Sequence, residues 1–581
     1  MAFQLSIPRR LLSVPDIFIF LLIGASIYAL TATGELWQAD YQPVTEIDLS
    51  VSALPRYALF SAMRGLAAYL ISLTYTLIVG YWAARSKAFE RVFIPITDIL
   101  QSIPVLGFLP GLVIGLIAVF PRTNMGLEIA AIIMIFTSQA WNMVFSFYNS
   151  LKSIPEDYLE AAKMMGFNAW DRFWRLEMPF AATGLAWNSL ISMAGGWFFL
   201  SICEAFTLGD RQFRLPGIGA YMAVAINQGN GDAIIYGIVA MLSLIIVLDF
   251  LIWHPILSWV RRFRLEETPG NDPTEPLMLL VLKESRIIRW IRYLYRRYIA
   301  RREFSTDGAF SVIPIKTLPQ VPQEVKKKLW SKSLKYVAPV LWIVLTIILI
   351  NGSIKLIQTL SIVPFETWLR LLKNTSFSFI RIAGAVTLCA LWAIPVGIWI
   401  GLSAKRIRIA QPIIQLLASF PAPMLYPLVL GIFLQLGVNF EIVAMILMFL
   451  AVQWYVLFNV LAGALKISRE LNDTLVLINT TRKERWKLLY LPSVFPALVP
   501  GLAAATGGSW NASIVAEYIV YKGKVFAANG LGAEISIAAS NANFPVLAAS
   551  LTIMVVVVVL LNRTLWAYLY KLSQTRYRMD I

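Results

Sequence analysis

The sequence is poor in the residues that enzymes and metal proteins use most. Its 581 residues include one histidine, His254, and two cysteines, Cys203 and Cys389. This scarcity excludes a disulfide scaffold and a Cys/His zinc site, and it leaves no Ser/His/Asp or Cys/His arrangement for nucleophilic catalysis. Both cysteines lie in apolar runs, where we expect them to be small core residues. We therefore expect a protein that is not an enzyme.

Charged residues are also scarce, and no ATP-binding loop is present. Only 14% of the residues are Asp, Glu, Lys or Arg, and 58% are hydrophobic, whereas a soluble domain is about 25% charged and about 45–50% apolar. This composition excludes a soluble globular enzyme and a disordered chain, and it fits a protein surrounded by lipid. The sequence contains no Gly-x-x-x-x-Gly-Lys-[Ser/Thr] loop. We expect no cofactor in this chain, so any ATP-Mg must bind to partner subunits.

Long apolar stretches recur along the whole chain. A membrane-spanning helix needs about 20 mostly apolar residues. We expect twelve spans, at residues 16–34, 57–84, 92–119, 127–149, 184–206, 234–260, 336–361, 368–402, 409–436, 441–463, 497–520 and 544–570. The first follows Arg9 and Arg10 but lacks a clear cleavage site, which favours an anchor helix over a signal peptide.

The net charge of +17 is distributed in a way that predicts the topology. If the N-terminus is inside, the inner segments hold 39 of the 50 Lys and Arg residues, whereas the first outer loop is acidic. Because cytoplasmic loops collect Lys and Arg, we expect both termini to be cytoplasmic. Segment 261–335 carries 17 basic and 8 acidic residues. Its stretch 277–302 alternates Arg with Trp and Tyr, which favours an amphipathic helix on anionic headgroups over nucleic-acid binding.

The chain contains an internal duplication. An offset of 317 residues superimposes Phe60-Ser61-x-x-Arg64 on Phe377-Ser378-x-x-Arg381, and three prolines keep the same register. An offset of 313 then superimposes Glu204 on Glu517 and the following Gly-x-Gly on its copy. Six spans per half make the copies parallel rather than inverted. We expect an N-terminal anchor helix and outer loop, a first repeat, a basic cytoplasmic linker, a seventh span and a second repeat, at residues 1–56, 57–260, 261–335, 336–366 and 367–581.

One inner loop of the first half has a specific pattern, Glu160-Ala161-Ala162 followed by Gly166. Pro155 suits the start of a short helix because its missing N–H is not needed there. Gly166 can adopt positive φ and end the helix, and the small pair Ala161-Ala162 permits close approach. Trp170 and Trp174 make the loop too apolar for a free hairpin in water. We expect a docking element for a protein on the cytoplasmic side.

This loop resembles the Glu-Ala-Ala-x-x-x-Gly loop in the membrane subunits of binding-protein-dependent ABC importers. The resemblance covers about 57–260 and again 367–570. It implies an all-α integral membrane protein with the type I importer permease fold, in the bacterial inner membrane. In that family the loop is a coupling helix that sits in a cleft of the ATPase. The implied partners are two ABC ATPase subunits and an extracytoplasmic substrate-binding protein, with no nucleic acid.

The second copy of the loop departs from the pattern. Its equivalent residues are Asp473, Thr474, Leu475 and Asn479, so the acid is kept and the small pair is lost. Asn adopts the left-handed conformation more readily than other non-glycine residues, so we expect the turn to persist. The resemblance thus implies that the ATPase-coupling residues are Glu160, Ala161, Ala162, Gly166, Asp473, Thr474, Leu475 and Asn479.

Within the family, three details resemble the branch for nitrate, taurine, sulfonates and bicarbonate. They are the repeated Phe-Ser-x-x-Arg, the Ser-x-Pro turns at Ser102 and Ser419, and the run from Gly507 to Gly532. The resemblance implies that the substrate is a small anion.

Several polar residues inside or beside the spans are candidates for the pathway or its gate. Glu204 and Glu517 can line the pathway, stabilise a gate or cap a turn, and we favour a gate or structural role because carboxylates bind anions poorly. Arg64 and Arg381 are expected to snorkel to the outer interface; the alternative is anion attraction or pairing with those glutamates. Gln101, Gln415 and Ser419 suit interhelix hydrogen bonds better than substrate contacts.

The sequence as a whole predicts two fused permease halves of an ATP-driven importer. One rival is a twelve-span secondary transporter driven by an ion gradient, and another is a structural membrane scaffold. The coupling loop favours the importer, since a secondary transporter has no partner for it.

Overall fold

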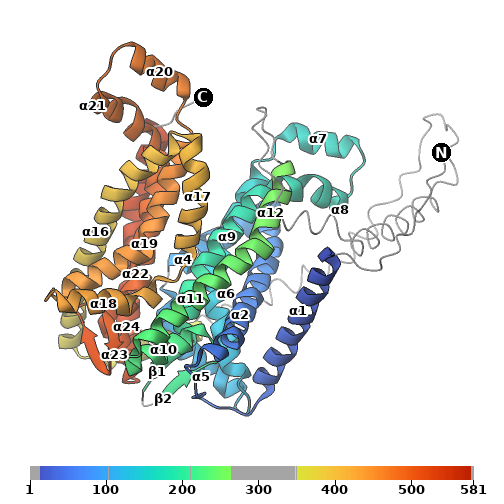
Figure 1. The fold of residues 1–581 in the computed structure, drawn as a ribbon. Coiled ribbons are helices and arrows are strands. Elements are labelled where there is room, and N and C mark those ends of the chain that lie inside the picture. The colour runs from blue at the N-terminus through green and yellow to red at the C-terminus, as the bar shows by residue number, and fades with distance from the viewer. Residues whose placement is uncertain (1–13, 103, 210, 264–346, 348–349, 577–581) are drawn as a thin grey trace, which may run out of the picture. The chain divides into compact units, whose positions relative to one another are not determined.

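The computed structural model describes residues 14–102, 104–209, 211–263, 347 and 350–576 (Figure 1). The chain divides into two units, one of residues 1–27 and 273–363, the other of residues 28–272 and 364–581. In the smaller unit, residues 14–27 and 350–361 are helical. The expected amphipathic helix at 277–302 and most of the expected span 336–361 lie outside the described residues.

The first repeat consists of helices joined by short turns, with one small hairpin. Its elements, with the preceding helix, are α1 (Val14–Gln38), α2 (Leu54–Tyr75), α3 (Tyr81–Arg85), α4 (Lys87–Ser102), α5 (Leu109–Val119), α6 (Met125–Lys152), α7 (Glu156–Met164), α8 (Ala169–Arg172), α9 (Met178–Cys203), β1 (Ala205–Leu208), β2 (Arg211–Arg214), α10 (Ile218–Gln228), α11 (Gly231–Leu248) and α12 (His254–Val260).

The second repeat has the same order of elements. They are α16 (Phe365–Gly401), α17 (Ala404–Ser419), α18 (Tyr426–Gln435), α19 (Phe440–Ala464), α20 (Arg469–Leu477), α21 (Arg482–Arg485), α22 (Leu491–Ala516), β3 (Tyr518–Tyr521), β4 (Lys524–Ala527), α23 (Leu531–Ser540), α24 (Phe544–Leu561) and α25 (Ala567–Arg576). Even local irregularities repeat, since π-helical turns occur at η4 (Phe173–Glu177) and η8 (Trp486–Tyr490), which are 313 residues apart.

Among the described residues, eight helices are long and apolar enough to cross a membrane, and they match eight of the twelve expected spans. The expected span 409–436 is instead the pair α17 and α18, bent by 80°. The bend follows Pro421, which begins a 3-10 turn at Ala422–Leu425, because proline cannot continue the hydrogen-bond ladder of a helix. The expected span 92–119 is interrupted in the same place, between α4 and α5. The full count of twelve stays a prediction.

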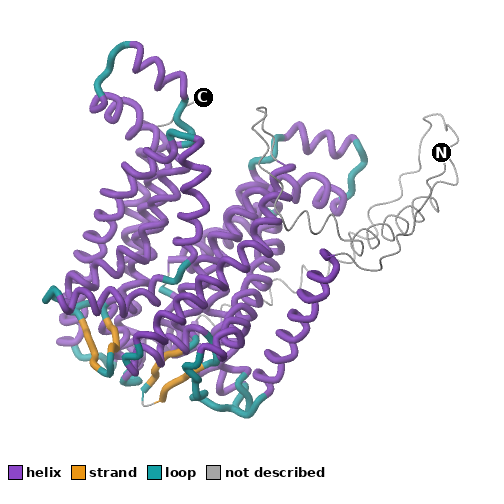
Figure 2. The backbone as a smooth tube through the Cα atoms, viewed as in Figure 1, coloured by secondary structure: helices purple, strands orange, loops and turns teal. Residues whose placement is uncertain are grey.

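The two antiparallel hairpins, β1–β2 and β3–β4, are the part of the fold that the sequence did not predict. In the second hairpin the two-residue turn has positive φ at both Lys522 (50°) and Gly523 (72°), the backbone twist that suits adjacent antiparallel strands. Figure 2 shows both hairpins at one end of the repeats and both short helical loops, α7–α8 and α20–α21, at the other. We call these ends the hairpin end and the loop end. This arrangement confirms that the repeats are parallel.

Each repeat has its longest helices packed around one central helix. In the first repeat α6 packs against α2 and α9, and in the second α19 packs against α16 and α22. The repeats also contact each other reciprocally. The 3-10 turn Val105–Phe108 of the first half packs against α22, and the turn Ala422–Leu425 packs against α9. One of these contacts is a hydrogen bond from the backbone N of Val105 to Oδ1 of Asn511, at 2.9 Å.

Candidate functional site

A buried polar network lies at the hairpin end of the first repeat. Arg64 of α2 donates from Nε and Nη2 to the two oxygens of Glu128, at 2.6 and 2.7 Å. Its Nη1 donates to Oε1 of Glu204, at 2.7 Å. Arg64 and Glu128 have side-chain exposures of 1% and 0%. A bidentate guanidinium–carboxylate pair is the strongest geometry for such a contact, so one cation here joins α2, α6 and the end of α9.

The second carboxylate of the network fixes the start of α10. Oε1 of Glu204 accepts a hydrogen bond from Ser61 Oγ at 2.7 Å, and Oε2 accepts one from the backbone N of Gly219, also at 2.7 Å. Ser61 Oγ in turn accepts from the backbone N of Ile218. These bonds satisfy the buried carboxylate, which would otherwise be costly away from water.

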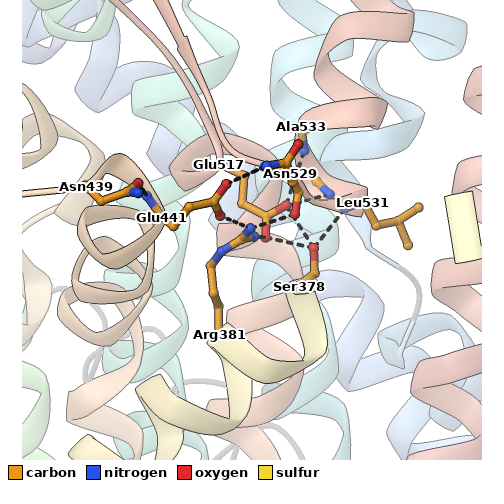
Figure 3. A network of polar contacts seen from close by, with 9 residues as sticks. Ser378, Arg381, Asn439, Glu441, Glu517, Asn529, Leu531 and Ala533 are labelled. Carbon is orange, nitrogen blue, oxygen red and sulfur yellow. Dashed lines mark hydrogen bonds and ion pairs between the residues drawn. The ribbon is translucent and has the colours of Figure 1, made fainter. Parts of the chain in front are cut away.

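The second repeat contains the same network with one side open (Figure 3). Arg381 pairs with both Glu517 and Glu441. Ser378 Oγ donates to Glu517 at 2.7 Å and accepts from the backbone N of Leu531 at 2.8 Å. Glu441 also accepts two hydrogen bonds from Asn529, both at 2.9 Å. The Glu441 side chain is 34% exposed, whereas its counterpart Glu128 is fully buried.

The Gly-x-Gly sequences are explained by close approach to these carboxylates. A Cβ on Gly217 would lie 2.3 Å from the Glu204 carboxyl group, and one on Gly530 would lie 2.1 Å from Glu517 Oε2. A Cβ on Gly532 would meet the backbone of Ser513 at 2.4 Å. The glycines therefore let the chain pass directly over the buried acids.

The expectation that Arg64 and Arg381 snorkel to the interface is wrong. Both are buried, and each is paired, which confirms the alternative of pairing with Glu204 and Glu517. Snorkelling failed because two carboxylates, rather than one, surround each guanidinium. Sequence reasoning missed Glu128 and Glu441. Both begin spans and are 313 residues apart, so a search for charges matched across the repeat would have found them.

Two other candidates lie where the repeats meet. Gln415 Nε2 of α17 donates to Oδ1 of Asp249, which belongs to the first repeat, at 3.0 Å. Ser419 lines a small cavity together with Asp249, Trp197 and Trp253. Gln101 is exposed near the end of α4. The preferred interpretation of Gln415, an interhelix hydrogen bond, is confirmed. Within the described part of the chain, no group of three or more His, Cys, Asp or Glu side chains can hold a metal ion.

Outside the spans, the acidic loop before α2 is locally ordered. Ser50 donates from its backbone N and its Oγ to the Asp48 carboxylate, at 2.8 and 2.7 Å. These hydrogen bonds from Ser50 hold the pKa of the exposed Asp48 carboxyl below its ordinary value, because they favour the charged form.

The first short loop, residues 154–177, has the expected helix–turn–helix form. Pro155 precedes α7, and Gly166 has φ of 73°. The backbone N of Phe167 donates to the carbonyl of Ala162 at 3.0 Å, which is the helix-ending pattern that requires a left-handed residue. Asn168 then caps α8 by accepting from the backbone N of Trp170 and Asp171. Glu160 and Gly166 are exposed, Ala161 is half-buried and Ala162 is buried.

The second short loop, residues 467–490, keeps this form with different residues. Asn479 has φ of 56°, which confirms that the turn persists without glycine. The backbone N of Thr480 donates to the carbonyl of Leu475 at 3.1 Å, the same bond as in the first loop. Asp473 and Thr474 are exposed and Leu475 is half-buried. Thr481 and Glu484 cap α21 reciprocally.

Each loop presents two adjacent apolar side chains at its tip. Met164 and Met165 are 90% and 71% exposed, and the equivalent Leu477 and Ile478 are 81% and 65% exposed. Large apolar side chains gathered at an exposed tip mark an interaction surface. Sequence reasoning singled out the small pair and the turn, and it missed these tips.

Comparisons with known proteins agree with this geometry. The family described as "Binding-protein-dependent transport system inner membrane component" matches residues 76–254 and again residues 393–578, together more than half of the chain. The two matches correspond to the two repeats.

Three curated relatives match parts of the chain. The bicarbonate transport system permease protein CmpB of Synechococcus elongatus is 27% identical over 147 residues, which are 25% of this chain and 51% of the relative. The nitrate import permease protein NrtB of Leptolyngbya laminosa is 27% identical over 24% of this chain and 48% of the relative. The glycine betaine/carnitine transport permease protein GbuB of Listeria monocytogenes is 24% identical over 31% and 58%.

The chain thus spans about half the length of the curated relatives that it matches. The paired matches, the duplicated all-α fold and the two loops lead to one assignment. The chain belongs to the family of binding-protein-dependent transport system inner membrane components, with two copies of the family's domain fused in one polypeptide.

Proposed function

We propose that the chain is the transmembrane permease of an ATP-driven ABC importer, and that it couples its pathway to separate ATPase subunits. The observation that carries this proposal is the pair of short loops at one end of the parallel repeats (Figure 1). Each has an exposed apolar tip, a left-handed turn and an exposed acid, Glu160 or Asp473. Two such tips suit two ATPase subunits with apolar clefts.

The proposed topology follows from the loops. The loop end faces the cytoplasm, where ATP is available, and both termini are cytoplasmic in a bacterial inner membrane. The hairpin end then faces outward, towards a substrate-binding protein. ATP-Mg binds to the partner subunits, and this chain carries no ATPase site of its own.

The roles of the polar candidates differ in this scheme. Glu160, Ala161, Ala162 and Gly166, with Asp473, Thr474, Leu475 and Asn479, form the two ATPase contacts. The networks of Arg64 with Glu204 and of Arg381 with Glu517 hold the outer ends of the helices together, a structural or gating role. Gln415 and Ser419 lie where the repeats meet, which suits a gate along the pathway.

We propose a small anion such as nitrate, a sulfonate or bicarbonate as the substrate. The printed functions of CmpB and NrtB support this choice. The match to GbuB favours a second candidate, a zwitterionic quaternary amine such as glycine betaine.

The direct test is transport by the purified chain, reconstituted in proteoliposomes with its ATPase subunits and a binding protein. We expect vanadate-sensitive uptake of labelled bicarbonate, nitrate or taurine that requires ATP and both kinds of subunit. Uptake of glycine betaine instead would select the second substrate. Uptake by the chain alone, driven by an ion gradient and insensitive to vanadate, would overturn the importer and support a secondary transporter.

A further inference from the structure

A buried carboxylate at the loop end has no role in the scheme above. Glu177 ends the turn Phe173–Glu177 that leads from the first loop into α9, and its side chain is fully buried. It forms an ion pair with Arg172 of α8, with 2.9 Å between Nε and Oε1. It forms a second ion pair with Arg85, the last residue of α3. One carboxylate therefore bridges the first loop and the helix of residues 51–85.

This helix is held by charge at both of its ends. Residues 51–85 form one membrane-length helical run. Arg64 joins its hairpin end to Glu128 and Glu204, and Arg85 joins its loop end to Glu177. An edge-on contact between the rings of Tyr81 and Phe173, 5.5 Å between centroids, adds an apolar link at the loop end.

The second repeat lacks the charges for this bridge. Tyr490 replaces Glu177 and Leu402 replaces Arg85 at the equivalent positions, so these positions cannot form an ion pair. The aromatic contact also changes partner. Trp486, equivalent to Phe173, packs edge-on against Tyr490 of its own loop at 5.9 Å. The contact that crosses from loop to helix in the first half is thus made within the loop in the second.

We propose that Glu177 is a positioning residue that locks the first loop to helix 51–85, so that the two repeats transmit the movement of their ATPases unequally. This inference rests on the proposed function. Breaking a buried ion pair removes a fixed link between two elements, and coupling between sites requires elements that move together. The first repeat then moves as one body with its ATPase contact, and the second follows with more freedom.

The bridge can be cut without leaving Glu177 unpaired. R172Q removes the link to the loop while Arg85 still neutralises Glu177, and R85Q removes the link to the helix while Arg172 remains. R175Q is the matched control, because Arg175 forms only an exposed pair with Asp171 at 3.7 Å. R485Q is the control in the second repeat, at the position equivalent to Arg172. All variants are made in the full chain.

Two measurements decide the inference. Hydrogen–deuterium exchange should show at least fivefold faster exchange of amides 167–176 in R85Q, although Arg85 lies on another element. In proteoliposomes with the ATPase, R85Q and R172Q should each lower uptake per ATP hydrolysed at least fivefold, with the ATPase still bound, whereas R175Q and R485Q stay within twofold of the unaltered chain.

Unchanged exchange in R85Q, or equal effects of R172Q and R485Q on uptake per ATP, would overturn the inference. If the unaltered chain shows no ATP-dependent uptake, the proposed function fails, and the exchange of 167–176 in R85Q still decides whether Glu177 locks the loop to the helix.

Discussion

At the residue scale, the notable feature is one guanidinium held by two carboxylates, made twice. In each network the charges alone would leave one excess negative charge. Backbone and side-chain donors, such as Ser61 and Gly219, or Ser378 and Gly532, satisfy the remaining carboxylate oxygens. The networks differ in solvent access, because Glu128 is sealed and Glu441 is partly open. This difference predicts unequal effects of the same substitution.

Replacing Arg64 by Gln should destabilise the protein more than replacing Arg381 by Gln. R64Q leaves Glu128 and Glu204 buried without a cation, which costs about 3–5 kcal/mol when a buried pair is broken. R381Q should cost roughly half of that, because water screens Glu441. Thermal unfolding of the two variants in the same detergent checks the order. An equal loss of thermal stability would contradict the assignment of a sealed and an open network.

Gly217→Ala tests the close approach to Glu204. The added methyl would overlap the carboxyl group at 2.3 Å, so we expect a loss of about 1–3 kcal/mol from overpacking. Gly231→Ala is the matched control, since an added Cβ there has no neighbour within 4 Å. The comparison is made by thermal unfolding. A stable G217A beside an unstable G231A would show that the glycine is not needed for approach to the acid.

The sequence indicated part of this site. The repeat placed Arg64 with Arg381 and Glu204 with Glu517, and pairing between them stood as an alternative. It did not reveal the second acid of each network, because Glu128 and Glu441 stand at the edges of apolar runs where a charge is ordinary. Which residues meet across 64 positions of sequence depends on the packing of α2 against α6, and periodicity alone does not fix that packing.

At the scale of elements, the two short loops reach one geometry with different residues. Both turns need a left-handed residue, supplied by Gly166 at φ of 73° and by Asn479 at φ of 56°. Glycine adopts this conformation at no steric cost, and Asn tolerates it better than most residues. The sequence predicted both turns from these preferences. It did not predict the hairpins, whose four-residue strands are too short to show an alternating pattern.

Valine at either turn should weaken binding of the ATPase, and more so at Gly166 than at Asn479. A β-branched residue at positive φ is strained, by roughly 1–2 kcal/mol. Asn479 already bears part of that strain, so N479V adds less. Co-purification of the ATPase with each variant gives the measurement.

Gly437 supplies the control for this prediction. It has φ of 67° and no neighbour within 4 Å of an added Cβ, but it lies between α18 and α19, away from the loops. G437V should carry similar strain and retain the ATPase. Equal losses of ATPase in G166V and N479V would argue against the asymmetry of the two turns.

At the scale of the whole molecule, fusion of the two copies has allowed them to diverge where they meet. The reciprocal contacts of the 3-10 turns with α9 and α22 are shared, but individual polar pairs are not. Asp249 of the first repeat meets Gln415 of the second, whereas the residue equivalent to Asp249 is Asn562. The duplication and its parallel sense were visible in the sequence. The partner of Gln415 was not, because nothing local to α17 records which helix of the other copy lies beside it.

The contact between Asp249 and Gln415 predicts how the join between the repeats can be opened. Q415E would place two carboxylates in contact, and like charges 4 Å apart repel by about 4 kcal/mol at an effective dielectric constant of about 20. Opening can be followed at Ser419, which lines the adjacent cavity. In an S419C background, labelling by a small charged thiol reagent at pH 8 should be at least fivefold faster with Q415E. Cys203 and Cys389 are buried, so their own labelling should be low.

The charge itself can be separated from any other effect of the substitution. Adding D249N to Q415E and S419C removes one carboxylate, so labelling should return to within twofold of S419C alone. Q435E, an exposed position at the end of α18, adds a charge away from the join and should leave labelling unchanged. If D249N fails to reverse the faster labelling, repulsion across the repeats is not its cause. If Q415E has no effect, the contact between Asp249 and Gln415 does not hold the join closed at this level.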